Sequence, residues 1–152
     1  MRFESCVEIG ASPERIWTEL RDAEAWPQWV PSIKKVKMAS PGSLGVGSEL
    51  YVTVRTVFPV TLRMTVTEFA PAQAVVMKGK VFGTALTRSY RLESVGWKTR
   101  LVAQGDASGL LQWVMCRSGQ RISDEILTAL KKRVESAVLS GAVKSPGDED
   151  HG

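Results

Sequence analysis

The chain has 152 residues, of which 43% are hydrophobic and 24% charged, and its formal net charge is +4 at pH 7. This length and composition predict one globular domain with a sizeable core. No apolar run approaches the roughly eighteen residues of a membrane span, and the opening MRFE leads into an alternating pattern instead of the apolar region of a signal peptide. We therefore expect a cytoplasmic protein without stable membrane insertion.

The cysteines and the basic residues give no sign of a metal or nucleic-acid site. Cys6 and Cys116 lie far apart and form no CxxC motif, which is typical of a reducing compartment and predicts no disulfide. The positive excess comes partly from Lys34, Lys35 and the run 131–133. Because the excess is small, we interpret it as a solvated basic face and expect no nucleic-acid partner.

The first elements are a strand and two short helices. Residues 2–9, RFESCVEI, alternate between apolar and polar side chains and predict a half-buried strand. The Ser-Pro-Glu sequence at 12–14 is typical of a helix start, and this helix is expected to run to about Arg21. A second short turn contains Trp26 and is bounded by prolines. Trp17, Trp26 and Trp29 either close the core there or line a pocket.

From Ile33 onward the period changes to two, which predicts about six strands joined by hairpin-length turns. Short turns between consecutive strands favour an antiparallel sheet. A glycine-rich loop follows the first of these strands. The predicted strands cover residues 32–40, 48–57, 59–69, 73–81, 84–94 and 99–105.

The last element is predicted to be the longest helix. Apolar residues recur every four positions along it, at Ile122, Ile126, Leu130 and Val134. The helix is expected to end at Gly141, and one interpretation starts it near Leu110, with Gly119 as an interior weak point. We expect one domain over 1–141 and a disordered, polar tail over 142–152.

Several segments together resemble the START-like superfamily, also called SRPBCC, of polyketide cyclase/dehydrase and lipid-transport proteins. They are VEIGASPERIWTELRDAEAWPQWVPSIKKV, LGVGSEL, VTEFAPAQAVVM, YRLESVGWKTRL and LTALKKRVES, and the resemblance covers residues 3 to about 139. It implies an α+β helix-grip fold, in which a curved antiparallel sheet of about six to seven strands wraps around a long C-terminal helix and two short helices follow the first strand. It also implies a deep, mostly apolar cavity that some members use to bind lipids, plant hormones or polyketides, and others to catalyse cyclisation or dehydration.

The sequence lacks the residues that most catalytic arrangements need. The single histidine, His151, lies in the predicted tail, so no histidine base or histidine metal site is expected. GSLGVGS lacks the Lys-Ser/Thr that follows a phosphate-binding loop. The acidic run 148–150 is interpreted as a solvated terminus. We expect no cofactor and no metal.

Arg88 breaks the apolar pattern of its strand. The alternation that points Tyr90 inward also points Arg88 inward. An unpaired buried charge is costly, so Arg88 must meet a carboxylate, reach solvent through a cavity mouth, or face an oxygen of a ligand. The candidate protein partners are Glu68, Glu93 and Asp106.

The leading functional interpretation is a module that binds a hydrophobic small molecule, lipid-like or polyketide-like, between the sheet and the last helix. Arg88 and Tyr90 would be its polar anchors. The candidate wall residues are Leu50, Val52, Leu62, Met64, Met77, Arg88, Tyr90, Met115, Ile122, Ile126 and Leu130. No catalytic residue is assigned for this binding module, whereas an enzyme of the cyclase/dehydrase type would polarise a ketone through Arg88 and Tyr90.

A third interpretation is a protein-interaction module whose cavity is filled by its own side chains. The segment 110–115, LLQWVM, holds too many consecutive apolar residues for one buried stripe. Some of them must face the cavity, its mouth or another protein surface, and a homodimer contact is one of the options.

Overall fold

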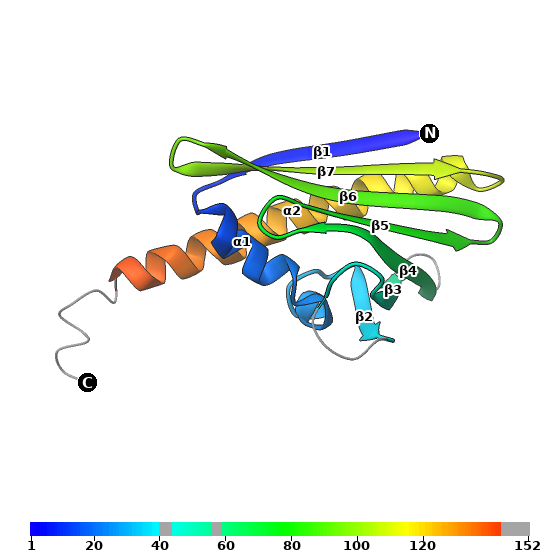
Figure 1. Ribbon diagram of the computed structural model, residues 1–152, viewed down its shortest axis with the longest axis horizontal. Helices are drawn as coiled ribbons and strands as arrows, with labels where there is room; N and C mark the ends of the chain where they lie inside the picture. The colour runs from blue at the N-terminus through cyan, green and yellow to red at the C-terminus, as the bar shows by residue number, and fades with distance from the viewer. Residues whose placement is uncertain (40–43, 56–58, 144–152) are drawn as a thin grey trace.

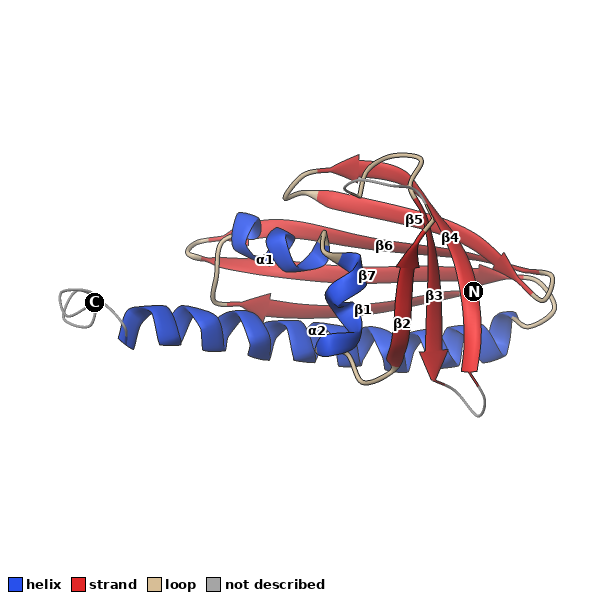
Figure 2. Ribbon diagram, turned by 90° about the horizontal axis from the view of Figure 1, so that it is seen from below, coloured by secondary structure: helices blue, strands red, loops and turns tan. Residues whose placement is uncertain are grey.

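The architecture is a curled half-barrel of seven antiparallel strands that grips one long helix (Figure 1). A computed structural model describes residues 1–39, 44–55 and 59–143. The strand order is β1-β7-β6-β5-β4-β3-β2. Figure 2 shows β2 and β3 crossing the helix α2 steeply, whereas β6 and β7 run nearly along it. The predicted α+β helix-grip fold is confirmed.

The strands agree with the predicted alternation. Their bounds are β1 Arg2–Ile9, β2 Ile33–Met38, β3 Glu49–Arg55, β4 Pro59–Ala70, β5 Ala74–Val81, β6 Thr84–Val95 and β7 Lys98–Ser108. The last of these was predicted too short, because β7 pairs with both β1 and β6 and so continues to Ser108. Register shifts lie in β4, between Val66 and Glu68, and in β2. Such irregularities bend a strand and increase its twist, which curls the sheet.

The two short helices after β1 are also confirmed. Helix α1 spans Pro13–Leu20, and the Ser12 side chain caps it by accepting a backbone N–H hydrogen bond. The second helix, η1, spans Ala23–Gln28 and is a 3-10 helix. The indole Nε1 of Trp26 donates to the carbonyl of Leu20 at 3.1 Å, which joins the two helices into one bracket at the edge of the half-barrel.

Helix α2 spans Gln112–Val143 and supplies the inner layer of the core. It begins at Gln112, two residues after the predicted start near Leu110. It continues two residues past Gly141, because one glycine costs a helix only about 1 kcal/mol. Residues 144–152, most of the predicted disordered tail, lie outside the described residues. None of the helices in the described ranges is long and apolar enough to cross a membrane.

Phe3 is wedged between the sheet and α2 at two glycines. A Cβ built on Gly105 of β7 would lie 1.9 Å from Cζ of Phe3, and one built on Gly119 of α2 would lie 2.5 Å from the same atom. The ring therefore fits only because neither glycine carries a Cβ. Gly119 has low helix propensity, but it is needed at this position because a larger residue would clash with the Phe3 ring.

Acidic side chains on α2 tie it to the elements around it. The Glu125 carboxylate accepts the backbone N–H of Ser32 at 2.8 Å and also the Ser32 hydroxyl. The Glu135 carboxylate accepts the backbone N–H of Gly10 at 2.8 Å. These bonds satisfy backbone donors in the connections that flank α1 and η1, where no strand partner is available.

We expect Glu125→Ala to lower the free energy of unfolding by about 1–2 kcal/mol, because it leaves the partly buried Ser32 N–H without its acceptor. Urea unfolding monitored by circular dichroism measures this change. Glu68→Ala is the control, since that glutamate is exposed on β4, and it should change stability by less than about 0.5 kcal/mol. Equal losses in the two variants would show that the Glu125 bonds contribute nothing specific.

Candidate ligand cavity

A small cavity lies between the concave face of the sheet and α2. Its volume is about 40 Å³. A still smaller space of about 10 Å³ adjoins it and shares part of its wall. The lining residues of the larger cavity are Trp26, Ile33, Val52, Val54, Leu62, Met64, Met77, Arg88, Tyr90, Ile122 and Ile126.

Eight of the predicted wall residues are brought together in this lining: Val52, Leu62, Met64, Met77, Arg88, Tyr90, Ile122 and Ile126. Three others are not. Leu50 and Leu130 are completely buried in the packed core, and Met115 packs against the core from the first turns of α2. Ile33 and Val54 also line the cavity but were not among the predicted wall residues. Val54 could have been predicted, because it has the same strand parity as Val52.

The cavity is far smaller than the deep one that the family resemblance implies. Its volume holds one to three water molecules by an order-of-magnitude measure, whereas pockets for drug-sized ligands enclose about 300–1,000 Å³. Met64 and Met77 in the wall are unbranched and adaptable side chains. A larger guest would therefore have to displace side chains of the wall, and the methionines are the ones that can move at least cost.

Arg88 points into this interior, as its strand parity predicts. Its Nη2 donates to the Ser123 hydroxyl of α2 at 2.5 Å, so the side chain spans the gap between sheet and helix. The guanidinium carbon lies 5.7 Å from the ring centroid of Phe3 and 5.8 Å from that of Tyr90. Two aromatic rings and one buried serine thus lie against the guanidinium, while the residue as a whole is half-buried.

The Arg88 charge has no carboxylate partner among the described residues. Asp106 and Glu93 form ion pairs with other cations, and Glu68 is exposed on β4. The Nε of Arg88 is buried and has no hydrogen-bond partner in the described part of the chain. A buried N–H left unpaired loses its hydration without compensation, typically at 1–3 kcal/mol, more when the group is charged.

A second buried donor faces the same region. The indole Nε1 of Trp29 is buried and lacks a partner within the described ranges, and Trp29 lines the smaller adjoining space together with Tyr90. Trp26 lines both spaces. Two of the tryptophans near the first helices therefore line the interior, whereas Trp17 packs on Phe69 with their ring centroids 5.2 Å apart.

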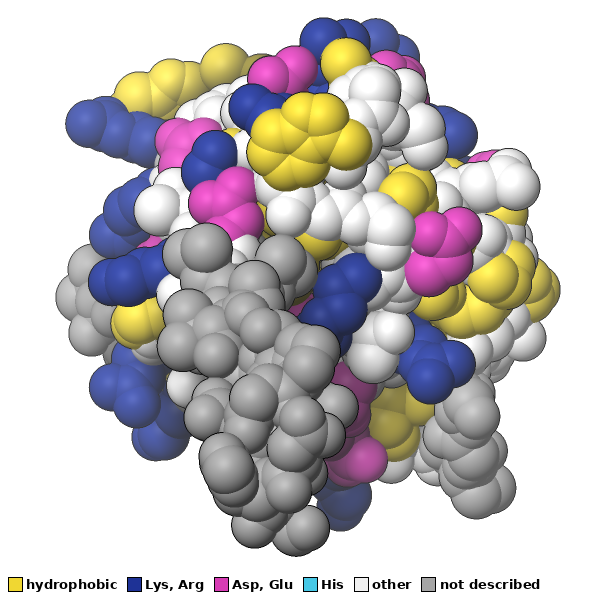
Figure 3. Space-filling model, turned by 90° about the vertical axis from the view of Figure 1, so that its left-hand side faces the viewer, with side chains coloured by type: hydrophobic (Ala, Val, Ile, Leu, Met, Phe, Trp, Pro, Cys, Tyr) yellow, Lys and Arg dark blue, Asp and Glu magenta, His cyan; other side chains and the backbone are white. Residues whose placement is uncertain are grey.

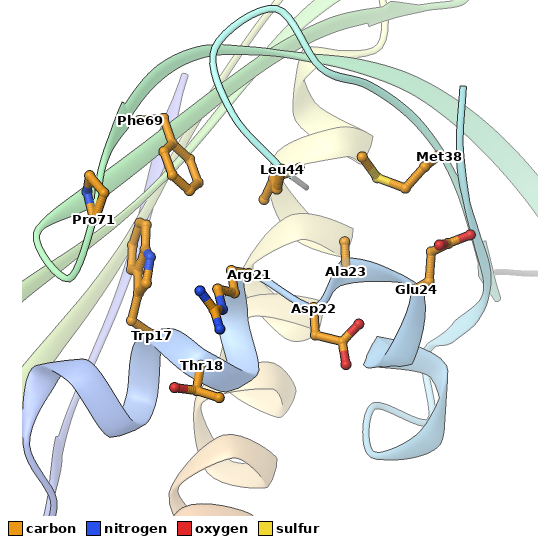
Figure 4. Close-up of a pocket in the computed structure, with 10 residues that line it drawn as sticks. All are labelled: Trp17, Thr18, Arg21, Asp22, Ala23, Glu24, Met38, Leu44, Phe69 and Pro71. Atoms are coloured by element: carbon orange, nitrogen blue, oxygen red, sulfur yellow. The ribbon is translucent and has the colours of Figure 1, made fainter. Parts of the chain in front are cut away.

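An open groove of about 590 Å³ lies between the α1–η1 bracket and the β4–β5 turn (Figure 4). Trp17, Phe69 and Pro71 lie at one side of it and Glu24 at the other. Arg21 and Asp22 bring opposite charges to its floor. Neither of the unpartnered buried donors, at Arg88 and Trp29, lies in this groove, so the interior cavity is the stronger candidate for a ligand site.

The described residues contain no group of three or more His, Cys, Asp or Glu side chains that could hold a metal ion. The polar chemistry of the cavity comes instead from the guanidinium of Arg88, the phenol of Tyr90 and the indole of Trp29. These groups suit a guest that supplies acceptor oxygens.

A family model described as polyketide cyclase / dehydrase and lipid transport matches residues 1–135. The match covers most of the chain, and the chain belongs to this family. The sequence resemblance to START-like proteins is thereby confirmed.

Solved structures with the same fold come from several bacteria. A START superfamily protein from Mycobacterium smegmatis superposes with a TM-score of 0.76 at 22% identity and covers 90% of this chain and 98% of its own. The Zhui aromatase/cyclase from Streptomyces sp. R1128 gives a TM-score of 0.80 at 16% identity over 91% of this chain and 95% of its own. At these identities the likeness is one of fold.

Among curated proteins, an uncharacterized protein of Mycobacterium tuberculosis is 36% identical over 53 residues. The matched segment is 35% of this chain and 32% of the relative, so the chain spans about a third of the length of that relative in the match.

Proposed function

We propose that the protein binds an apolar small molecule, lipid-like or polyketide-like, that carries a carbonyl or carboxylate oxygen. The site is the cavity between the sheet and α2. The observation that carries this proposal is the buried Nε of Arg88, a charged donor that has no partner among the described residues and lies in a mostly apolar wall. An acceptor oxygen at this position would restore the lost hydrogen bond, and such charge-assisted bonds are worth about 1.5–3 kcal/mol.

The apolar body of the guest would contact the apolar side chains that line the cavity together with Arg88. Met64 and Met77 come from β4 and β5, and Ile122 and Ile126 come from α2. We propose that the methionines rotate to enlarge the cavity when a guest enters, because their side chains have several accessible rotamers and soft sulfur contacts. The two free cysteines, Cys6 exposed and Cys116 buried, fit a cytoplasmic setting for this carrier.

A second candidate function, catalysis of cyclisation or dehydration, is favoured by the position of Tyr90 beside Arg88 in the same wall. A hydrogen bond from the guanidinium to a ketone oxygen would make the carbonyl carbon more electrophilic. The Tyr90 phenol could exchange a proton with the ketone oxygen. The family description and the aromatase/cyclase among the structural neighbours support this candidate. A catalyst would release a changed product, whereas a carrier returns its guest unaltered.

Native mass spectrometry with matched probes tests the proposal. We expect a stoichiometric adduct with dodecanoic acid or anthraquinone, at an affinity at least tenfold higher than for dodecane or anthracene, since one charge-assisted hydrogen bond corresponds to about tenfold or more. Arg88→Met should abolish this preference while keeping the apolar volume.

Arg91→Met is the matched control, because Arg91 is exposed on the other face of the same strand. It should bind both probes as the wild type does. If no probe forms an adduct, or if Arg88→Met retains the full preference for the oxygen-bearing probes, the proposed site is wrong. Conversion of a polyketone probe to a cyclised product by the wild type alone would favour the enzyme.

A further inference from the structure

Four apolar side chains stand exposed at one end of the molecule. We call Phe82, Leu110, Trp113 and Val114 the apolar tip, and their exposed fractions are 65%, 90%, 61% and 49%. Phe82 lies in the β5–β6 turn, and the others lie at the connection from β7 into α2. Both segments lie at the end of the half-barrel opposite to the C-terminal end of α2 (Figure 1).

The two segments of the apolar tip are in direct contact. The backbone N–H of Leu111 donates to the Thr84 hydroxyl at 2.9 Å. A Cβ built on Gly109 would lie 2.7 Å from the carbonyl oxygen of Gly83, so the backbones meet without an intervening side chain. The exposed residues of the two segments therefore form one protrusion rather than two separate ones.

The β5–β6 turn holds Phe82 outward at a conformational cost. Val81 pairs with Thr84, and the two residues between them, Phe82 and Gly83, both have positive φ, at 48° and 74°. Two-residue hairpin turns of this kind favour Asn-Gly or Asp-Gly, because a bulky side chain is strained at positive φ. A phenylalanine that is strained and mostly exposed gains little from the fold itself, which indicates a contact outside it.

The charged residues in the two stretches that contain the apolar tip are all basic. No Asp or Glu occurs in residues 69–92 or 107–123, the two stretches that contain it. Lys80 is exposed on the sheet side, and Arg117 and Arg121 are exposed on the helix side. The guanidinium carbon of Arg117 lies 5.7 Å from the ring centroid of Trp113. The first turn of α2 has no acidic residue, although a helix start favours one.

Charges at the border of this region are already compensated. Asp106 forms an ion pair with Arg2 at 3.9 Å. Arg63 donates to the Glu49 carboxylate at 2.6 Å, and this hydrogen bond and the charge of Glu49 raise the pKa of the Arg63 guanidinium. Lys80, Arg117 and Arg121 are among the exposed cations near the apolar tip.

We propose that the apolar tip is a peripheral docking site for an anionic lipid bilayer. Phe82 and Trp113 would enter the headgroup region, where aromatic side chains are favoured, and the flanking cations would meet lipid phosphates. A second copy of this chain is disfavoured because it would bring like charges together. This inference does not depend on the cavity.

The other end of the molecule differs in character. Figure 3 shows separate hydrophobic patches there, interspersed with basic and acidic side chains of the described residues. Trp97 belongs to the β6–β7 turn and is 75% exposed, with the Lys98 ammonium 5.0 Å from its ring centroid. It also lies over Gly10, close to the Glu135 carboxylate. Trp97 is therefore an exposed tryptophan with both basic and acidic groups nearby, and it serves as the matched control for Trp113.

Co-sedimentation with vesicles tests the docking site. We expect binding to vesicles of phosphatidylcholine with 30% phosphatidylglycerol, and weak or no binding to phosphatidylcholine alone or at high salt. Phe82→Ala with Trp113→Ala should lower the partition coefficient by at least tenfold, since each large apolar side chain contributes that order. Lys80→Gln should lower it about fivefold. Trp97→Ala should leave it unchanged.

Three outcomes would overturn the proposal. One is a failure of the wild type to bind the anionic vesicles. Another is an equal loss in Trp97→Ala and Trp113→Ala. The third is the absence of vesicle binding together with another interaction that requires Trp113. If that interaction is binding to immobilised polyglutamate, the tip would be assigned to an acidic protein. If it is dimerisation in solution, the tip would be assigned to a second copy. Circular dichroism of each variant verifies that the fold is kept.

Discussion

Gly105→Ala is expected to lower the free energy of unfolding by about 3 kcal/mol, at the upper end of the cost of overpacking a core. The new Cβ would lie 1.9 Å from Cζ of Phe3. The ring cannot retreat, because Gly119 of α2 approaches it closely from the other side. Guanidinium unfolding followed by circular dichroism gives the change in free energy.

The cause of this loss can be isolated with a second substitution. In a Phe3→Ala background, Gly105→Ala should cost far less, so that the double-mutant cycle gives a coupling of about 1–3 kcal/mol. Gly45→Ala is the matched control, because a Cβ there meets nothing within 4 Å. If Gly105→Ala unfolds like Gly45→Ala, the wedge of Phe3 between two glycines does not constrain the fold.

Arg88→Met is expected to raise the free energy of unfolding of the ligand-free protein by about 1–2 kcal/mol, although it removes binding. The substitution puts an apolar chain of similar length in place of a guanidinium whose buried Nε has no partner in the described ranges. Replacing buried charges by apolar side chains often stabilises a protein by 1–4 kcal/mol. Ser123, which loses its donor, can turn its hydroxyl to a carbonyl of its own helix.

Differential scanning calorimetry of wild type, Arg88→Met and the control Arg91→Met measures this prediction. A gain in stability together with a loss of binding would identify Arg88 as a residue kept for its ligand at a cost to the fold. A clear loss of stability in Arg88→Met, with Arg91→Met unchanged, would instead assign Arg88 a structural role through Ser123 and remove the main support for the ligand site.

Period-two alternation was sufficient to predict the sheet and the inward position of Arg88. Parity fixes the face on which a side chain lies, and no bulge interrupts β6 between Thr84 and Tyr90. Parity does not give the distance to the opposite layer. Leu50 and Leu130 follow the same periodic patterns as the cavity wall, yet both are completely packed. The volume of the cavity depends on how α2 sits against the curl of the sheet, which no periodic pattern contains.

The neighbours of Arg88 and of the apolar tip could be identified only from three-dimensional contacts. Three carboxylates were possible partners of Arg88, and strand register directs Asp106 and Glu93 to other cations. The apolar excess of residues 110–115 left three interpretations open: the cavity, its mouth or another protein surface. The participation of Phe82 could not be predicted, because it follows from the meeting of Gly83 and Gly109, which are distant in sequence.

Helix α2 is one unbroken rod that carries both Trp113 and the cavity residue Ile126, about 20 Å apart at 1.5 Å per residue. Between them, Gly119 rests on the Phe3 ring. The exposed end and the cavity wall thus belong to one continuous element that packs on the ring at an intermediate point. If a guest in the cavity and a membrane at the tip favour different tilts of this helix, thermodynamic reciprocity requires each to change the other's affinity by the same factor.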